Sequence, residues 1–233
     1  DPQTRLVAVA DAFREKAVSS LQNLGAQMAE RIDVPDERIF DGFDGYKGVI
    51  GSGVEVVLLA TPPHFRPQHL RACIEAGKNV FAEKPVAVDA TGIRSVLESS
   101  RMAKEKNLSV VSGLCWRYET HTLDLMKRLH DGAIGDIVTL NATRFGGGVW
   151  TRPKEAGMSE MQYQMNNWYY FTWLSGDHIV EQHVHDLDVC NWVMNGPPVE
   201  ARGAGGRQVR IGPQYGEIFD HHSIEYTYAN GVK

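Results

Sequence analysis

The sequence predicts an α/β fold whose first part is a doubly wound parallel sheet, and two observations support this prediction. In the first half of the chain, short apolar runs alternate with segments of helical pattern, which is the order of elements in parallel sheets. The runs are continuously apolar and bounded by turn residues, as in strands that helices bury on both faces. The composition changes after Tyr118, which places domains at residues 1–118 and 119–233.

The first two predicted strands both end on polar or turn-forming residues. Residues 5–10 form an apolar run that ends on Asp11, and a helix is expected from about Phe13 to Arg31. Residues 54–60 form the second run. It ends on Ala60 and is followed by Thr61, Pro62, Pro63 and His64. In a parallel sheet these ends meet at one edge, where ligands bind, although Asp11 could also be an ordinary helix N-cap and the prolines could simply shape a turn.

The next elements continue the alternation. A helix is expected over residues 67–76 and ends before Gly77, a residue typical of helix C-termini. The strand at residues 79–82 follows. Asp89 is expected to cap a helix that runs to about Lys106, and residues 109–112 form a further strand. The inner face of the longer helix is predicted to carry Ile93, Val96, Leu97 and Ala103.

The tripeptide Glu83-Lys84-Pro85 stands at the carboxyl end of the strand at residues 79–82. Because Pro85 disfavours the helical conformation of the residue before it, Lys84 is expected to be extended. An extended Lys84 would point into the crevice beyond the strand ends, where the chemistry of such sheets takes place. The alternative is that Glu83 and Lys84 form a surface ion pair.

The second domain has a less regular pattern. A short helix is expected over residues 123–129, a strand-rich region from residues 135–144, and a strand over residues 224–228. The segment from Gly146 to Ser175 is expected to be a long loop rich in glycine, asparagine and aromatic residues, Trp168 among them. Aromatic faces suit the C–H faces of sugars, but packing in a core or a subunit interface explains them equally well.

Residues 177–195 are best interpreted as one helix that ends before Gly196-Pro197. Glu181, His185 and Asp188 are then spaced i, i+4 and i+7 and share one face. His185 is the best candidate for a general acid or base, because the unperturbed pKa of histidine is near neutrality. The alternative is a solvated helix face that carries a histidine by chance.

Histidines are frequent in this region, and His183 and His185 form an H-x-H pattern that raises the question of a metal. On a helix two residues at i and i+2 point about 200° apart, so they cannot share an ion. We therefore expect no metal site, an expectation that would change if the segment were a strand.

Composition narrows the classes of function. The net charge of −5 argues against nucleic acid as the main partner, and no apolar stretch approaches the roughly 18 residues of a membrane span. Cys73, Cys115 and Cys190 are widely spaced and form no C-x-x-C pattern, so buried free thiols are expected.

Taken together, these motifs resemble the Gfo/Idh/MocA family of NAD(P)-dependent sugar and polyol oxidoreductases. The resemblance runs from Asp11 to Asp188 and rests on segments 7–11, 60–64, 75–80, 83–85, 116–118 and 181–188. It implies a Rossmann-type domain followed by an α+β substrate domain with an open, mostly antiparallel sheet. It also implies a homo-oligomer, a dimer or tetramer, that acts on a small carbohydrate and binds neither nucleic acid nor membrane.

The resemblance also implies roles for individual residues. Asp11 would accept hydrogen bonds from both ribose hydroxyls of the cofactor and would repel a 2′-phosphate, so NAD is favoured over NADP although Arg14 lies nearby. The family usually has aspartate where this chain has Glu181. The implied cofactor-binding residues are Asp11, Ala60, Thr61, Pro62, His64, Glu83 and Lys84; the catalytic ones are Lys84, His185 and Glu181; and those for the substrate are Arg117, Tyr118, Trp168 and Asp188.

One expected motif is missing. The glycine-rich dinucleotide fingerprint belongs about 20 residues before the ribose-binding acid, and only ten residues precede Asp11. We therefore expect the first strand and its glycine loop to be absent, and the turn at Asn230-Gly231 has no return strand. The chain is interpreted as a fragment cut at both ends, with a cytoplasmic location as the default and export left open.

In the implied reaction, His185 assisted by Lys84 removes a hydroxyl proton of a sugar or polyol, while the cofactor takes the hydride. Two alternatives stay open. One is an NAD-dependent glycoside hydrolase of the same fold that oxidises, eliminates, hydrates and re-reduces its substrate. The other is a non-enzymatic Rossmann relative that acts as a sensor or scaffold.

Overall fold

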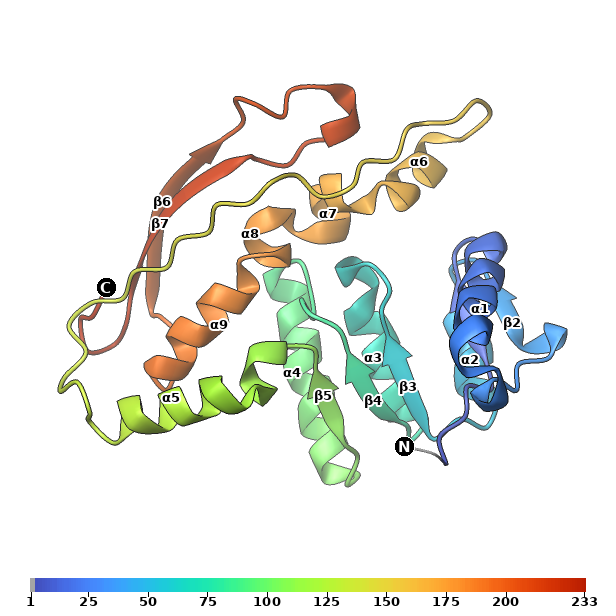
Figure 1. Cartoon of the computed structure of the whole chain (residues 1–233), viewed down its shortest axis with the longest axis horizontal. Helices are drawn as coiled ribbons and strands as arrows, with labels where there is room; N and C mark the ends of the chain where they lie inside the picture. The colour runs from blue at the N-terminus through green and yellow to red at the C-terminus, as the bar shows by residue number, and fades with distance from the viewer. Residues whose placement is uncertain (1–2) are drawn as a thin grey trace. The chain divides into compact units, whose positions relative to one another are not determined.

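A computed structural model describes residues 3–233, which divide into two units (Figure 1). We describe each unit by itself. Unit 1 comprises the described residues up to Thr61 together with Phe65–Val86 and Ala90–Ser112; unit 2 comprises Pro62–His64, Ala87–Asp89 and Gly113–Lys233.

Unit 1 contains five parallel strands in two ladders. Strands β1 (Val9–Asp11) and β2 (Ile39–Asp41) pair with each other, and β3 (Val56–Leu59), β4 (Asn79–Ala82) and β5 (Val110–Ser112) form a separate sheet in that order. All pairs are parallel, as the sequence predicts. Strand β2 was not predicted.

The helices of unit 1 follow the expected positions closely. Helix α1 (Arg14–Met28) continues into a 3-10 turn, and α3 (Arg66–Glu75) and α4 (Ala90–Glu105) are the connections between β3, β4 and β5. Helix α2 (Gly45–Gly51) is short and was not predicted, because three of its seven residues are glycines.

The core of unit 1 lies on one face of the β3–β4–β5 sheet, against α3 and α4 (Figure 1). Side chains alternate along β3, so Val57 and Leu59 are buried while Val56 and Leu58 are 53% and 70% exposed. Both faces of the sheet were expected to be buried, but along β3 only the face that carries Val57 and Leu59 is buried. The buried core residues are Val57, Leu59, Leu70, Cys73, Ile74, Val80, Ala82 and Ala103.

The predicted inner face of α4 is wrong in part. Ile93 and Leu97 are 42% and 65% exposed. The buried stripe runs instead through Val96, Ser99 and Ala103, which are spaced i, i+3 and i+7. Ser99 can be buried there because its hydroxyl donates a hydrogen bond to the carbonyl of Ser95, at 2.8 Å. Because one residue of this stripe is a serine, a search for apolar residues at helical spacing does not find the stripe.

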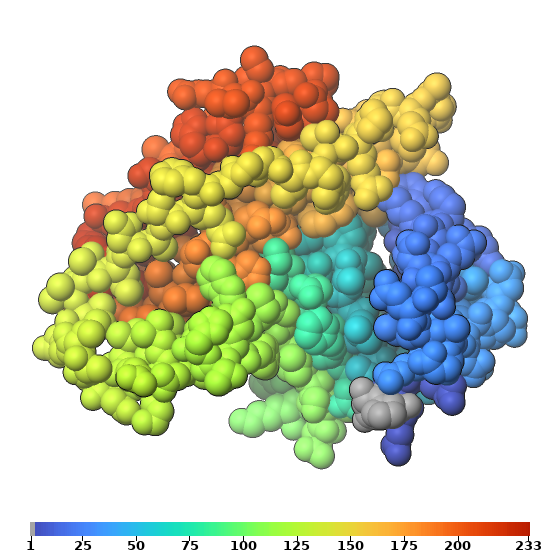
Figure 2. Space-filling model, in the orientation of Figure 1, coloured from blue at the N-terminus to red at the C-terminus, as the bar shows by residue number. Residues whose placement is uncertain are grey.

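Unit 2 is mainly helical and irregular, with one antiparallel pair of strands. A 3-10 turn at Cys115–Tyr118 precedes α5 (Thr120–His130), and the expected strand-rich region at residues 135–144 is wrong, because no strand forms there. That stretch runs as a narrow yellow-green band over the surface in Figure 2. Val138 is 79% exposed and the adjoining Phe145 is 95% exposed, so no apolar face drives the stretch into a sheet.

The expected loop from Gly146 to Ser175 contains two helices. Helix α6 (Glu160–Asn166) begins at a capping box, in which Ser159 and Gln162 each bond the other's backbone N–H. Helix α7 (Thr172–Ser175) is a single turn that ends at Gly176. The interpretation of this whole segment as a loop is therefore wrong.

The helix predicted over residues 177–195 is broken into α8 (Asp177–Glu181) and α9 (Val184–Val193). The break falls at Gln182 and His183, so the argument that Glu181, His185 and Asp188 share one helix face does not hold. The periodicity of residues 177–195 is nearly continuous, and the interruption is a tertiary effect that no local breaker residue signals.

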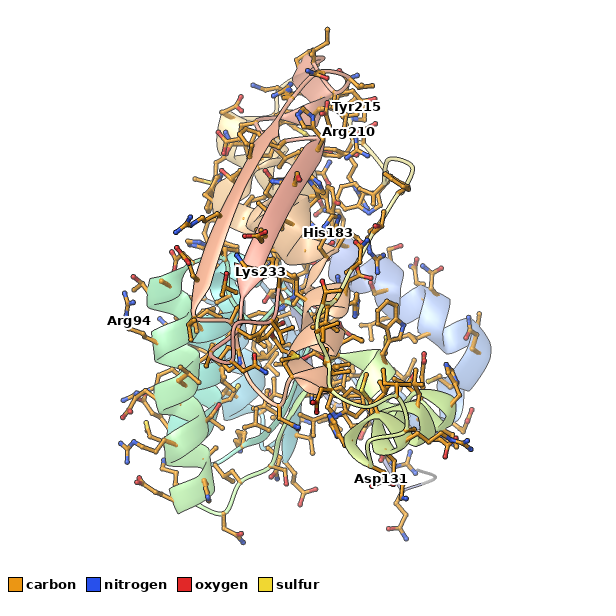
Figure 3. The ribbon with its side chains drawn as sticks, turned by 90° about the vertical axis from the view of Figure 1, so that its left-hand side faces the viewer. Arg94, Asp131, His183, Arg210, Tyr215 and Lys233 are labelled. Carbon is orange, nitrogen blue, oxygen red and sulfur yellow. The ribbon has the colours of Figure 1, made fainter. Side chains whose placement is uncertain are left out.

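Strands β6 (Glu200–Gly206) and β7 (His221–Thr227) pair along their whole length. Three glycines in β6 allow a close approach, since a Cβ on Gly203 would lie 2.6 Å from the carbonyl oxygen of Ser223. The connecting loop, which includes Arg210 and Tyr215 in Figure 3, is held by Asp220. Its carboxylate accepts backbone N–H groups of Gln208, Val209 and Arg210, and these bonds lower the pKa of Asp220.

Helix α2 offers a direct test of packing in unit 1. A Cβ on Gly48 would lie 2.4 Å from the ring of Phe40, whereas a Cβ on Gly51 would meet nothing within 4 Å. We expect Gly48→Ala to lower the free energy of unfolding by about 1–3 kcal/mol, the usual range for overpacking. Gly51→Ala is the matched control, and it should raise stability by up to about 1 kcal/mol through helix propensity. Urea denaturation measures both, and equal effects would contradict the packing.

Candidate functional site

In unit 1 the residues predicted to bind the cofactor lie at strand ends, as expected. Asp11 ends β1, and its Oδ1 accepts the backbone N–H of Phe13 at 2.9 Å, next to the start of α1. Arg14, which lies nearby, forms an ion pair in this arrangement. Its guanidinium donates to the carboxylate of Asp36 at 2.7 Å and to the carbonyl oxygen of Ile39.

The turn after β3 is supported by a buried histidine that the sequence analysis did not single out. Thr61 Oγ1 lies 3.3 Å from Nδ1 of His69, whose side chain stacks on Tyr46 with ring centroids 4.3 Å apart. Ala60 is exposed, and Thr61 and Pro62 are half-buried. Within unit 2, the predicted cofactor residue His64 is exposed and packs edge-on to Trp173, with centroids 5.1 Å apart.

Glu83 and Lys84 follow the last residue of β4 and are both half-buried. The backbone N–H of Lys84 donates to Oε2 of Glu83 at 3.1 Å. The buried guanidinium of Arg66 donates to the carbonyl of Pro85 and fixes the turn. Because β3 and β4 are in register, with Leu59 opposite Ala82, the turn at Thr61 and the turn at Glu83 lie at the same edge of the sheet.

In unit 2, His185 is the second residue of α9 and is half-buried. Its ring packs against Trp116 with centroids 5.3 Å apart, and its Nδ1 is shielded from solvent. Glu181 ends α8, is 7% exposed and accepts a hydrogen bond from the side chain of Gln182 at 2.6 Å. A buried carboxylate and an imidazole therefore lie on either side of the helix break.

Two of the predicted substrate residues bind each other. Arg117 donates through Nε and Nη2 to the two oxygens of Asp188, at 2.7 and 2.8 Å, and its guanidinium lies 4.8 Å from the ring centroid of Trp192. The hydrogen bonds that Arg117 donates to Asp188 raise the pKa of Arg117. A second pair, Arg144 with Asp186 at 2.6 Å, flanks it. These pairs fix α9 to the 3-10 turn and to the irregular segment.

The aromatic residues of the predicted loop divide into two groups. Tyr169, Tyr170 and Phe171 are buried, and burial raises the pKa of Tyr169 and Tyr170. This favours the core interpretation for them. Trp168 is half-buried, 5.9 Å from the ring of Trp150, and the predicted substrate residue Tyr118 is 63% exposed. The side chains of Trp168 and Tyr118 therefore have exposed surface that a ligand could contact.

A cluster of titratable side chains in unit 2 lies outside every predicted role. Asp177 and His178 at the start of α8 meet His222 of β7, which is remote in sequence. Burial alone would raise the pKa of Asp177, but hydrogen bonds from His178 and the backbone of Phe219 hold it below its usual value. No spacing pattern connects residues 177 and 222, so only the tertiary structure brings them together.

A hollow of about 600 Å³ lies elsewhere in unit 2, between residues 136–138, Val193, Met194 and residues 230–232. It includes none of the predicted site residues. No helix among residues 3–233 is long and apolar enough to cross a membrane.

Comparison with known proteins identifies the class. The model of the "oxidoreductase family, NAD-binding Rossmann fold" of GFO/IDH/MocA proteins matches residues 1–113, and that of the GFO/IDH/MocA C-terminal domain matches residues 122–233. Together the two matches span nearly the whole chain. The chain therefore belongs to the GFO/IDH/MocA family of oxidoreductases, as its motifs predicted.

Individual relatives agree with this. An uncharacterized oxidoreductase of Streptococcus pneumoniae is 24% identical over 93% of this chain and 51% of its own length. An inositol 2-dehydrogenase of Rhizobium meliloti is 22% identical over 94% of the chain and 56% of its length. The crystal structure of the WlbA dehydrogenase from Bordetella pertussis with NADH and UDP-GlcNAcA superposes with a TM-score of 0.69, at 19% identity, over 99% of this chain and 58% of that one. The chain spans about half the length of the curated relatives that it matches.

The buried histidine behind Thr61 predicts a pH dependence of stability. Burial lowers the pKa of His69 from 6.5 to about 4. The unfolded chain therefore binds the proton more readily, so the stabilisation is complete above about pH 6.5 and is lost as the pH falls towards 4. We expect this residue alone to reduce the free energy of unfolding by about 3 kcal/mol across that interval.

Urea denaturation at pH 7 and at pH 4.5, on the wild type and on His69→Asn, measures this contribution. The asparagine cannot titrate, so the variant should lose clearly less stability on acidification than the wild type does. Identical losses in the two proteins would show that His69 is not held neutral by the fold.

The bidentate ion pair between Arg117 and Asp188 predicts that two aspartates of unit 2 contribute differently to the free energy of unfolding. Asp188→Asn should lower the free energy of unfolding by about 1–3 kcal/mol, because it leaves the guanidinium of Arg117 poorly compensated while Asp188 itself is only 14% exposed. Asp124→Asn is the control, since its pair with Arg128 is exposed and such pairs contribute about 0–1 kcal/mol. A thermal melt of each variant measures the difference, and equal melting temperatures would contradict it.

Proposed function

We propose that this chain belongs to an NAD-dependent oxidoreductase that transfers a hydride between nicotinamide and a hydroxyl-bearing carbon of a sugar or polyol. The observation that supports the proposal best is the pair of half-buried residues Glu83 and Lys84, which β4 delivers to the edge of the parallel sheet where Thr61 also lies. That edge is where open α/β sheets bind ligands. The name of the inositol 2-dehydrogenase relative supports a polyol as the substrate class.

The residues at the strand ends of unit 1 have the chemistry that a dinucleotide needs. Oδ2 of Asp11 makes no hydrogen bond with any of residues 3–233, so it is available to a ribose hydroxyl. The ion pair of Arg14 with Asp36 engages a nearby cation that could otherwise bind a 2′-phosphate, which favours NAD over NADP. Ala60, Thr61 and Pro62 would line the crevice, and His64, Glu83 and Lys84 would lie near the nicotinamide end.

NAD, when bound, would supply the acceptor for the hydride that leaves the carbinol carbon. His185 would accept the hydroxyl proton through its imidazole, so that one proton and one hydride leave and a carbonyl remains. Lys84 would donate a hydrogen bond to the same oxygen and stabilise the negative charge that develops there. Glu181 would orient the imidazole or balance its charge, while Tyr118 and Trp168 would offer aromatic surface to the sugar.

The ion pair between Arg117 and Asp188 changes the role expected of these two residues. Since the charges compensate each other, we assign them to positioning α9, and hence His185, ahead of direct substrate binding. Substrate contact by either residue would need the pair to open.

Cofactor binding tests the first half of the proposal. Calorimetric titration of the chain should give tighter binding of NAD than of NADP. Asp11→Asn should weaken NAD binding about 10–100-fold, because hydrogen bonds to a charged carboxylate contribute about 1.5–3 kcal/mol. Asp41→Asn is the matched control, since Asp41 ends the neighbouring strand in register with Asp11 and is exposed. Failure of both this chain and the full-length protein to bind either dinucleotide would overturn the cofactor assignment.

Turnover tests the second half. With myo-inositol and NAD as the probe, Lys84→Met and His185→Asn should each reduce the rate of NADH formation by about 10²–10⁴-fold, the usual contribution of a general acid or base. Lys104→Met and His121→Asn remove an exposed lysine and an exposed histidine and serve as controls. Retention of most activity in either site variant, with circular dichroism unchanged in both, would disprove the assignment of that residue.

A further inference from the structure

The cluster at the start of α8 contains two imidazoles and a carboxylate from two distant segments of unit 2. Asp177 and His178 open the helix, and His222 lies in the second position of β7. One ligand-type atom from each lies within 4.8 Å of the others. Their side chains are only 12–13% exposed, so the cluster is largely shielded from solvent. It belongs to neither the cofactor edge nor the proposed catalytic residues.

The distances agree with the geometry of a small metal ion. Two ligands bound to Zn²⁺ at about 2.0–2.1 Å in tetrahedral geometry lie about 3.3 Å apart. Oδ1 of Asp177 lies 2.8 Å from Nδ1 of His178 and 3.8 Å from Nε2 of His222, and these values bracket that separation. The ligand atoms of His178 and His222 lie within 4.8 Å of each other, so local side-chain adjustment would bring the three atoms into coordinating positions.

The carboxylate of Asp177 is fixed by bonds that leave one oxygen directed at the imidazoles. Its Oδ2 accepts the backbone N–H of Phe219 at 2.9 Å, and its own backbone N–H donates to Oγ of Ser175 at 3.0 Å. The residue also has a φ of 69°, in the left-handed region that few residues other than glycine adopt. With Oδ2 bound to Phe219, Oδ1 faces the ring nitrogens of His178 and His222, and it also accepts the backbone N–H of His178.

The hydrogen bond between Asp177 and His178 does not by itself explain the cluster, because His222 is buried there as well. Its Nε2 is buried and has no hydrogen-bond partner among residues 3–233, and Oδ1 of Asp177, at 3.8 Å, is beyond hydrogen-bond distance. Its ring packs 4.4 Å from that of His178 and 5.5 Å from that of Phe219. A polar atom buried without a partner destabilises a fold, and a bound ion would supply the missing interaction.

We propose that Asp177, His178 and His222 bind a divalent transition-metal ion of the Zn²⁺ class. Three protein ligands of this type leave the remaining position of a tetrahedral ion to water. Imidazole ligands favour Zn²⁺, Co²⁺ or Ni²⁺ over Mg²⁺ and Ca²⁺, which prefer oxygen. The ion joins α8 to β7. It therefore holds the segment that leads into the helix break, and this inference stands whether or not the proposed hydride transfer is correct.

Metal titration of the chain tests the site. After treatment with EDTA and dialysis, calorimetry with ZnCl₂ should show one equivalent bound, and Co²⁺ should give the visible absorption of a tetrahedral nitrogen and oxygen site. Mg²⁺ should not compete. Zinc should also raise the melting temperature of the wild type, because an ion that binds only the folded state stabilises it.

Variants on two different elements make the test specific. His222→Asn and His178→Gln should each weaken zinc binding by at least about 10–100-fold, the range that even outer-shell partners of metal ligands contribute. His221→Asn is the matched control: the residue neighbours His222 in β7, its side chain is 50% exposed, and alternation along a strand points it to the opposite face. Cys115→Ser controls for binding at the exposed thiol.

Absence of stoichiometric zinc binding to the wild type would overturn the proposal. So would zinc affinity that stays within about threefold of the wild type in both His222→Asn and His178→Gln, since loss of a true ligand exceeds the effect of an outer-shell partner. Circular dichroism checks the fold of each variant. If one fails to fold, the other decides the outcome, because the two histidines stand on separate elements.

Discussion

The parallel register of β3, β4 and β5 is the constraint on which the proposed cofactor site depends. Parallel neighbours cannot be joined by a tight turn, so each connection crosses the sheet as a helix, here α3 and α4. The two helices pack on the same face, and their apolar residues hold the strands in line. As a result the turn at Thr61 and the turn at Glu83 stand at one edge, although they are 22 residues apart in the sequence.

Unit 2 is organised by a different principle. Its one sheet has two strands, and much of the chain between residues 131 and 159 is irregular. Charged side chains add directional contacts to the buried aromatic residues Tyr169, Tyr170 and Phe171. Arg117 forms an ion pair with Asp188, and Arg144 forms one with Asp186. Asp220 accepts backbone hydrogen bonds from the loop between β6 and β7. These contacts are specific in direction, which explains how a segment with two short helices and a break can place His185 reproducibly against Trp116.

Sequence analysis predicted unit 1 well because its signals are local. Four of its five strands are apolar runs, and α1, α3 and α4 have clear boundaries, whereas α2 was missed because glycine weakens helix propensity and β2 because it is only three residues long. In unit 2 the signals are tertiary. The break at Gln182 and His183, the burial of Tyr170 and the glycine-rich strand β6 have no local signature.

The residues of the candidate site also divide into those that sequence analysis could identify and those that only the structure brings together. The strand-end residues Asp11, Thr61 and Lys84 could be selected from sequence because chemistry at strand ends is a property of the fold class. The pairing of Arg117 with Asp188, the support of Thr61 by His69, and the meeting of His222 with Asp177 depend on contacts across 8 to 71 residues of sequence. A spacing argument cannot find such contacts.

The reactivity of the buried thiol of Cys73 reports how often the core of unit 1 opens. Cys73 is 1% exposed in the core between α3 and the sheet, and burial raises the pKa of its thiol to about 11. Alkylating reagents need both access and the thiolate, so Cys73 reacts only when this core opens, whereas Cys115 is exposed in the native state. The ratio of the two labelling rates therefore measures how often the layer that supports the proposed cofactor edge opens under native conditions.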